Sequence, residues 1–195
     1  KMKNMEETRK DLEDKLRNEQ KEKKILQNDL ETTSNIALMS GGLYTNGYSL
    51  QCYSFSSTGA FNDVRIFSLD SNSVFTVTND WLVSGASSGE TILTDNASLI
   101  IIKKAVGVFT FNGGGRLYAN MQIDSGTYCR MGGDPASFNQ LILDPGTKLE
   151  LSDAQSYFFN ELIARGIVTD SINIFSAVAG NQATINDTNG GKNCL

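Results

Sequence analysis

The chain has 195 residues, no histidine and a formal net charge of −5. Without histidine it lacks the commonest general base and the commonest metal ligand. Its sparse acidic charge argues against nucleic acid and anionic membranes as partners, because clustered cations bind both. It contains no run of 18 apolar residues, so we expect no segment that spans a membrane.

Residues 1–31 are predicted to form one helix, because they contain neither Gly nor Pro and consist almost entirely of good helix formers. They carry nine basic and nine acidic residues. A narrow apolar seam at heptad spacing cannot stabilise a lone helix in water, but it can stabilise a coiled coil. We predict a coiled coil over residues 1–33; the alternatives are a solvated single helix and a disordered charged tail. The residues expected to drive association are Met5, Leu12, Leu16, Leu26 and Leu30.

From residue 36 the composition changes to Gly, Ser, Thr, Asn and β-branched residues, so residues 34–41 are predicted as a junction and residues 42–195 as a β-rich body. Clusters of Gly, Asn and Ser separate the strand candidates and predict turns. Only Tyr157–Ala164 is interpreted as a weak helix candidate. The predicted strands are Tyr48–Phe55, Val64–Leu69, Val74–Thr78, Ser98–Ile102, Val106–Phe111, Leu117–Ile123, Gln140–Leu143, Lys148–Leu151 and Ile172–Phe175.

One stretch, residues 137–152, shows how the body is organised. Two short runs with alternating apolar residues flank Asp144-Pro145-Gly146, whose chemistry is typical of a tight turn. The pair Phe-Asn, which opens this stretch, also occurs at positions 61, 111 and 159. The pair therefore recurs about every two dozen residues, which is the length of one rung of a β-solenoid. A β-sandwich gives no reason for the pair to recur at a regular spacing. We expect each Phe to stack on the next rung and each Asn amide to bridge turn backbones.

The same residues carry a resemblance to known proteins. Residues 138–151, 41–59 and 172–185 resemble rungs of large secreted β-helix surface proteins of Bacteroidetes, and the same modules occur in fibre proteins of phages that infect such hosts. The resemblance covers roughly residues 40–195. A coiled coil that leads directly into a β-helix is similar to the shaft-to-body junction of trimeric phage fibres. The resemblance therefore implies a parallel β-solenoid behind an N-terminal, trimeric coiled coil.

Catalytic chemistry is not expected in this chain. A glycosidase needs two facing carboxyl groups about 5–10 Å apart, and the candidate aspartates are marked by no motif; we interpret them as turn residues that bond their own backbone. Lys103-Lys104 is interpreted as a solvated strand edge, and Gly113-Gly114-Gly115 as a turn, since it lacks the Lys-Ser/Thr of a phosphate loop. No catalytic, cofactor-binding or metal-binding residue is predicted. The candidate aspartates are Asp63, Asp70, Asp80, Asp95, Asp124, Asp134, Asp144 and Asp153.

The aromatic residues and the cysteines each allow two interpretations. Trp81, with Tyr44, Tyr48 and Tyr53, could form a sugar-stacking surface, but aromatic residues in a rung are more often core. The three cysteines show no CxxC pair; we interpret them as small buried hydrophobes on strands, while a disulfide between two of them stays open. They are Cys52, Cys129 and Cys194.

The function expected from this pattern and from the resemblance is mechanical and adhesive. We expect a structural segment of a phage tail or head fibre that presents a host-binding surface, located in the virion fibre or at an extracellular cell surface. The expected partners are the chain itself as a homotrimer, neighbouring fibre or virion proteins, and a host surface glycan. The alternatives are a bacterial cell-surface adhesin and a polysaccharide-degrading tailspike. The chain ends as another strand begins, which predicts a fragment of a longer protein.

Overall fold

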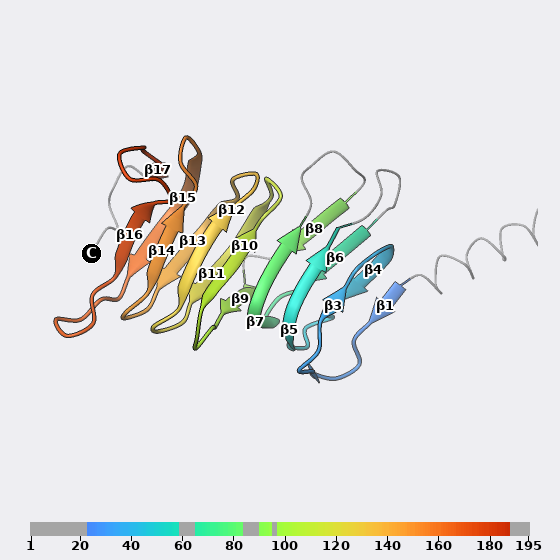
Figure 1. Ribbon diagram of the computed structural model, residues 1–195. Coiled ribbons are helices and arrows are strands. Elements are labelled where there is room, and N and C mark those ends of the chain that lie inside the picture. Colours follow the sequence, from blue (N-terminus) through green and yellow to red (C-terminus); the bar gives the residue numbers. More distant parts are fainter. Residues whose placement is uncertain (1–22, 59–64, 84–89, 95–96, 188–195) are drawn as a thin grey trace, which may run out of the picture.

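The computed structural model of the protein describes residues 23–58, 65–83, 90–94 and 97–187 (Figure 1). These residues form strands, turns and loops, and none of them is helical. The strands are β1 (Lys23–Ile25), β2 (Leu30–Glu31), β3 (Ile36–Ala37), β4 (Gly41–Tyr44), β5 (Leu50–Ser57), β6 (Arg65–Leu69), β7 (Val74–Val83), β8 (Glu90–Thr94), β9 (Leu99–Ile102), β10 (Val108–Asn112), β11 (Leu117–Ile123), β12 (Tyr128–Gly132), β13 (Ser137–Leu143), β14 (Lys148–Leu151), β15 (Ser156–Ala164), β16 (Asn173–Ser176) and β17 (Thr184–Asp187).

The strands stack in parallel into the walls of a solenoid, with β1 at one end and β16 and β17 at the other (Figure 1). One wall contains β1, β4, β6 and β8. A second wall follows the order β7, β9, β11, β13, β15 and β17, and a third the order β7, β10, β12, β14 and β16. The long strand β7 belongs to both, because its first half pairs with β9 and its second half with β10. The predicted parallel β-solenoid is therefore confirmed.

The length of a rung varies along the solenoid. Lys23 pairs with Gly42, whereas Trp81 pairs with Phe111 after a longer path along the chain. Shorter and longer rungs stack equally well, because extra residues enter the loops between strands while each strand keeps its backbone partners. The spacing of about two dozen residues expected for a solenoid rung is correct as an average, and no fixed period holds.

Most predicted strands are present, but the prediction for Tyr157–Ala164 has to be corrected. The helix interpretation is wrong there, since β15 occupies this segment and pairs with β13. Its alternation of buried and exposed side chains at Tyr157, Phe158 and Phe159 is the period of a strand. The short strands β4, β8, β12 and β17 are present without having been predicted, and the glycines of β4 extend a wall instead of forming a turn.

The predicted coiled coil over residues 1–33 differs from the structure in its last third. Residues 23–25 and 30–31 form β1 and β2, which pair with β4 and β5. Leu26 packs against the core, and Leu30 is exposed beside Leu50, so neither lies on a helical seam. The open edges of β4 and β5 offer backbone partners that outweigh local helix propensity. The described residues are thus already in strands at Lys23, well before the predicted start at residue 42. Met5, Leu12 and Leu16 lie outside the described residues.

Aromatic rings fill much of the space inside the rungs. Phe138 stacks on Phe159 with ring centroids 5.6 Å apart, and it lies 5.7 Å from the ring of Tyr118. The predicted stacking of Phe on Phe between rungs is confirmed for this pair. Phe111 belongs to a different wall, where its strand partners are Trp81 and Met131, and it meets Phe138 across the core at 5.8 Å. Position 61 lies outside the described residues.

Asparagines beside these rings form a ladder of their own. The Asn160 side-chain amide donates to the side-chain oxygen of Asn139 at 3.1 Å, and Asn139 donates to Asn120 at 3.4 Å. Asn112 bonds a turn backbone as expected, because its side-chain oxygen accepts from the Gly114 N–H at 3.1 Å. The amides therefore join rung to rung as well as supporting a turn.

The turn predicted at residues 144–146 is present as a corner between β13 and β14. Gly146 has a φ of 75°, and the Thr147 N–H donates to the Asp144 carbonyl at 3.2 Å. A Cβ on residue 146 would crowd the Asp170 carboxylate of the next rung, which would then have to move. Gly suits this position because it adopts the positive φ at little cost and leaves that carboxylate in place.

Candidate functional site

The aspartates singled out in the sequence bind neighbouring rungs. Asp70 accepts from the Asn46 N–H at 2.7 Å, and Asp80 accepts from the Thr110 N–H at 3.1 Å. In both pairs the donor lies on an adjacent rung, far from the aspartate along the chain. These carboxylates are structural, as expected, but they bond the backbone of an adjacent rung instead of their own.

Three of the other candidate aspartates bond side chains from neighbouring rungs. Asp124 forms an ion pair with Lys103 at 3.3 Å. Asp144 accepts from the Gln122 amide at 2.5 Å and lies 3.4 Å from the Arg165 guanidinium. Asp153 accepts from the Asn181 amide at 2.9 Å, while Asp134 lies at a turn where its carbonyl accepts from Gly115. Asp63 and Asp95 are outside the described residues.

Of the two adjacent lysines, Lys103 is solvated as predicted and Lys104 is not. Lys103 is exposed and pairs with an aspartate, as described above. The Lys104 ammonium instead donates to the Asn79 side-chain oxygen at 2.7 Å and to the Val108 carbonyl at 2.6 Å. Lys104 therefore fixes the loop that leads into β10. The three glycines at 113–115 form a turn before β11, as predicted.

Trp81 belongs to the core. It is fully buried, its ring lies 4.6 Å from that of Phe55, and its indole N–H donates to the Tyr118 hydroxyl at 3.2 Å. That hydroxyl in turn donates to the Gly113 carbonyl at 3.0 Å, so the polar edge of the tryptophan is satisfied inside the solenoid. The core interpretation of Trp81 is confirmed, whereas Tyr48 and Tyr53 are exposed.

The two described cysteines are free and buried on strands, which confirms their interpretation as small hydrophobes. Burial raises the pKa of the Cys52 thiol to about 12 and raises the pKa of Cys129 as well. Both thiols are therefore protonated and unreactive at neutral pH. Cys194 lies outside the described residues.

Polar and aromatic side chains converge in a groove on the third wall, near the C-terminal end. This groove, of about 600 Å³, is lined by Tyr128 and Arg130 of β12, Glu150 of β14, Phe175 of β16 and the loop that follows β16 to residue 181. Arg130 pairs in register with Glu150, and Glu150 with Phe175, so the three form one outward row across three rungs. We call it the Arg130 groove.

Strand alternation places these side chains on the outside. Cys129 and Met131 point into the core, so Tyr128 and Arg130 on either side of Cys129 face outward. The ring centroids of Tyr128 and Phe175 lie 6.0 Å apart. Phe175 remains 40% exposed, which leaves part of its ring available to a ligand.

Glu150 is the centre of the polar network in the groove. Its Oε1 accepts from Arg130 Nε at 2.7 Å, and its Oε2 accepts from Arg130 Nη2 at 3.2 Å and from the Tyr128 hydroxyl. The bidentate pair fixes the plane of the guanidinium. The Glu150 side chain is 7% exposed, while that of Arg130 is 50% exposed. The carboxylate is thus a buried anchor, and the guanidinium is its accessible partner.

The hydrogen bonds shift the titration of all three groups. Burial acts to raise the pKa of Glu150, but the bonds from Arg130 and Tyr128 outweigh it, and the pKa lies below its ordinary value. The bond to Glu150 raises the pKa of the Tyr128 hydroxyl and that of the Arg130 guanidinium. At neutral pH the groove therefore holds a carboxylate, a guanidinium and a protonated phenol, and its formal charges cancel.

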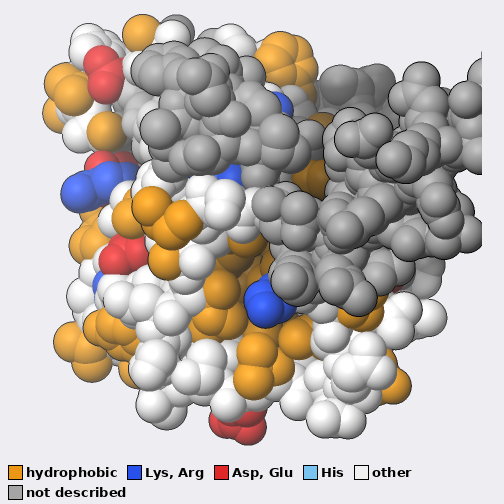
Figure 2. Space-filling model, turned by 90° about the vertical axis from the view of Figure 1, so that its right-hand side faces the viewer, with side chains coloured by type: hydrophobic (Ala, Val, Ile, Leu, Met, Phe, Trp, Pro, Cys, Tyr) orange, Lys and Arg blue, Asp and Glu red, His pale blue; other side chains and the backbone are white. Residues whose placement is uncertain are grey.

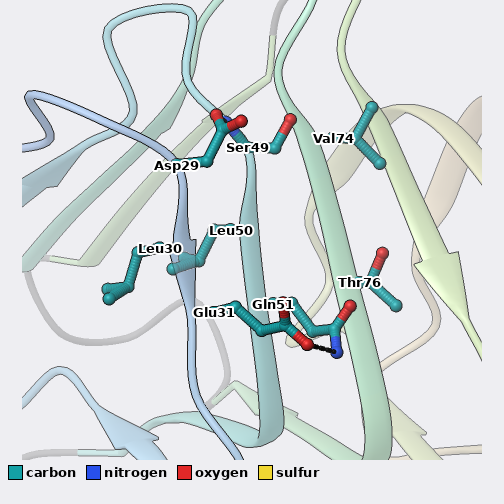
Figure 3. Close-up of a pocket in the computed structure, with 8 residues that line it drawn as sticks. All are labelled: Asp29, Leu30, Glu31, Ser49, Leu50, Gln51, Val74 and Thr76. Carbon is teal, nitrogen blue, oxygen red and sulfur yellow. Dashed lines mark hydrogen bonds between the residues drawn. The ribbon is translucent and has the colours of Figure 1, made fainter.

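A second groove of about 390 Å³ crosses β2, β5 and the start of β7 (Figure 3). Its polar groups hold the two-residue strand β2 in place: the Gln51 amide donates to Glu31 at 3.0 Å, and Asp29 accepts from the Ser49 N–H at 2.7 Å. Leu30, assigned above to the coiled-coil seam, lies in this groove. The Arg130 groove is the stronger candidate site, because it combines an exposed aromatic ring, Phe175, with the half-exposed guanidinium of Arg130.

Charge is sparse on the face toward β1. Figure 2 shows that uncharged polar and apolar side chains dominate its described part, with basic and acidic groups scattered among them. This agrees with the low charge of the body in the sequence, and such a surface offers no cluster of cations for a polyanion.

Comparison of the chain with protein-family models, with curated proteins and with solved structures found no match. Among the described residues no helix is long and apolar enough to cross a membrane, and no group of three or more His, Cys, Asp or Glu is arranged to hold a metal ion. What defines the chain is therefore its own geometry: a parallel β-solenoid with a polar and aromatic groove on its side.

Proposed function

We propose that this chain is a structural segment of an extended fibre, in which a stiff β-solenoid presents a binding surface to a host cell. The observation that carries the proposal is that side chains of neighbouring rungs bond to and stack on one another. Described carboxylates, amides and aromatic rings join neighbouring rungs, as in the Asn120, Asn139 and Asn160 ladder. A body built in this way resists bending and local unfolding, because each rung is held by the next.

The particular fibre that the resemblance favours is a phage tail or head fibre. A bacterial cell-surface adhesin has the same physical requirements and is the alternative. In either case the chain works in a virion fibre or at an extracellular cell surface, beside neighbouring fibre or virion proteins. The sparse, scattered charge (Figure 2) supports a glycan as host partner better than a nucleic acid or a membrane.

The proposed fibre is a homotrimer held by the N-terminal segment. With Leu26 and Leu30 in the solenoid, the seam is reduced to the apolar residues before Lys23, including Met5, Leu12 and Leu16. We expect Leu12→Glu together with Leu16→Glu to convert a trimer into a monomer in sedimentation equilibrium. A wild-type chain that sediments as a monomer at high micromolar concentration would remove the trimer from the proposal.

The function is tested by binding of the labelled full chain to Bacteroidetes cells. Saturable binding that an excess of unlabelled chain displaces is the expected result, and its absence on all strains of a broad panel contradicts the proposal. The rival class is a tailspike that degrades polysaccharide. Release of reducing sugar from purified capsular glycan, abolished by an Asp→Asn or Glu→Gln scan, would establish that rival.

A further inference from the structure

We propose that the Arg130 groove binds a neutral pyranose unit of a cell-surface polysaccharide. The inference rests on the proposed function and assigns a site and a ligand class to it. It starts from the row of Arg130, Glu150 and Phe175, which parallel pairing places side by side on the outer face of β12, β14 and β16.

The charge of the groove selects an uncharged ligand. Arg130 and Glu150 neutralise each other through two hydrogen bonds, at 2.7 and 3.2 Å. A cationic ligand would meet the exposed guanidinium of Arg130, and an anionic ligand would gain little, because Glu150 already neutralises that guanidinium. A ligand hydroxyl group can accept a hydrogen bond from the exposed side of Arg130 without breaking its pair with Glu150.

The aromatic residues select a ligand with an apolar face. Tyr128 and Phe175 lie with ring centroids 6.0 Å apart, and Val178 in the adjoining loop is also exposed. A pyranose ring presents C–H groups on its face and hydroxyl groups around its edge. It can therefore cover the Phe175 ring with its face while its edge reaches Arg130, which matches an apolar groove with a few convergent polar groups.

The polar side of the groove is held in place before any ligand arrives. Both oxygens of Glu150 accept hydrogen bonds, from Arg130 and Tyr128, and the carboxylate is buried, so it fixes the plane of the guanidinium. The exposed half of Arg130 is then the part that a ligand can touch. Fixing a long side chain in advance lowers the entropy lost on binding.

The groove is suited to binding and not to cleavage. Among the described residues that line it, Glu150 is the one carboxylate, whereas hydrolysis of a glycosidic bond requires a pair. The Tyr128 hydroxyl donates to Glu150 and its pKa is raised, so it is not a base at neutral pH.

The test measures binding of the full chain to immobilised neutral hexasaccharides (glucan, mannan and galactan), with a hexauronate as the anionic probe. Two variants have matched controls elsewhere on the solenoid. Phe175→Ala is compared with Phe158→Ala, since the two rings are 40% and 43% exposed. Arg130→Lys is compared with Arg165→Lys, since both arginines pair with a carboxylate and both side chains are 50% exposed. Melting temperatures establish that each variant is folded.

We expect at least one neutral hexasaccharide to bind, about tenfold loss of affinity for each groove variant, and less than about twofold change for each control. Binding of the hexauronate alone, no binding of any probe, or equal losses in variants and controls would overturn the proposal. If the groove variants bind cells as well as the wild type, the groove assignment fails and the fibre function stands. If neutral hexasaccharides bind at the groove but no cell does, the fibre function fails and the groove stands.

Discussion

Phe138 is a core residue whose truncation should destabilise the solenoid strongly. It is buried, and its ring centroid lies 5.7 Å from that of Tyr118, 5.6 Å from Phe159 and 5.8 Å from Phe111. Burial of a Phe removes about 150–250 Å² from water, and at about 25 cal/mol per Å² this corresponds to about 4–6 kcal/mol. The methyl group of Ala keeps part of this burial energy, whereas the cavity left by the ring adds to the loss. We therefore expect Phe138→Ala to lower the free energy of unfolding by about 3–5 kcal/mol.

The measurement is urea-induced unfolding followed by far-ultraviolet circular dichroism, with Phe158→Ala as the control. Phe158 lies on β15 beside Phe159 but points outward, so its loss should cost less than about 1.5 kcal/mol. Hydrogen exchange should show that protection falls first in β11, β13 and β15, because rungs contact only their neighbours. Equal losses for the two variants would refute the assignment of Phe138 to the core.

Three further predictions concern a charge, a turn and the thiols. The pKa of Glu150 is lowered in the folded chain, so its contribution to stability is complete above its ordinary pKa and disappears as the pH falls through the lowered value. The difference in urea midpoint between the wild type and Glu150→Gln should therefore shrink in acid. A difference that stays constant with pH would contradict this. Gly146→Ala should lower the free energy of unfolding by about 2 kcal/mol and Gly126→Ala by about 1 kcal/mol. Both glycines have positive φ, but of the two only Gly146 faces a neighbouring carboxylate. A larger loss for Gly126→Ala than for Gly146→Ala would contradict this reasoning. In a chain whose third cysteine is replaced by serine, Cys52 and Cys129 should react with a thiol reagent only after unfolding; rapid reaction of the native chain would contradict their burial.

The solenoid could be predicted from sequence because its evidence is local. Residues 137–152 carry their own strand period and their own turn, and the return of Phe-Asn indicated that such units repeat. The same reasoning misplaced Phe111, since a dipeptide does not reveal which wall of the rung it occupies. It also extended the N-terminal helix into β1 and β2, where helix propensity is outweighed by pairing with β4 and β5.

The Arg130 groove could not be predicted, because it depends on register. The path along the chain from Arg130 to its partner Glu150 is shorter than the path from Glu150 to Phe175. The difference comes from the longer loop between β15 and β16, so no constant spacing brings the three together. The one sequence signal was the alternation at Tyr128, Cys129 and Arg130, which places two polar side chains on the same outer face.

The most direct test of the account is whether β12 and β16 lie on the same face, separated by one strand. In the full chain with selectively labelled aromatic rings, nuclear Overhauser effects between the ring protons of Tyr128 and Phe175 measure this. We predict clear cross-peaks, because the ring centroids are 6.0 Å apart although the two residues are far apart in sequence. Assigned rings without such cross-peaks would contradict the parallel stacking of β12, β14 and β16, and with it the groove.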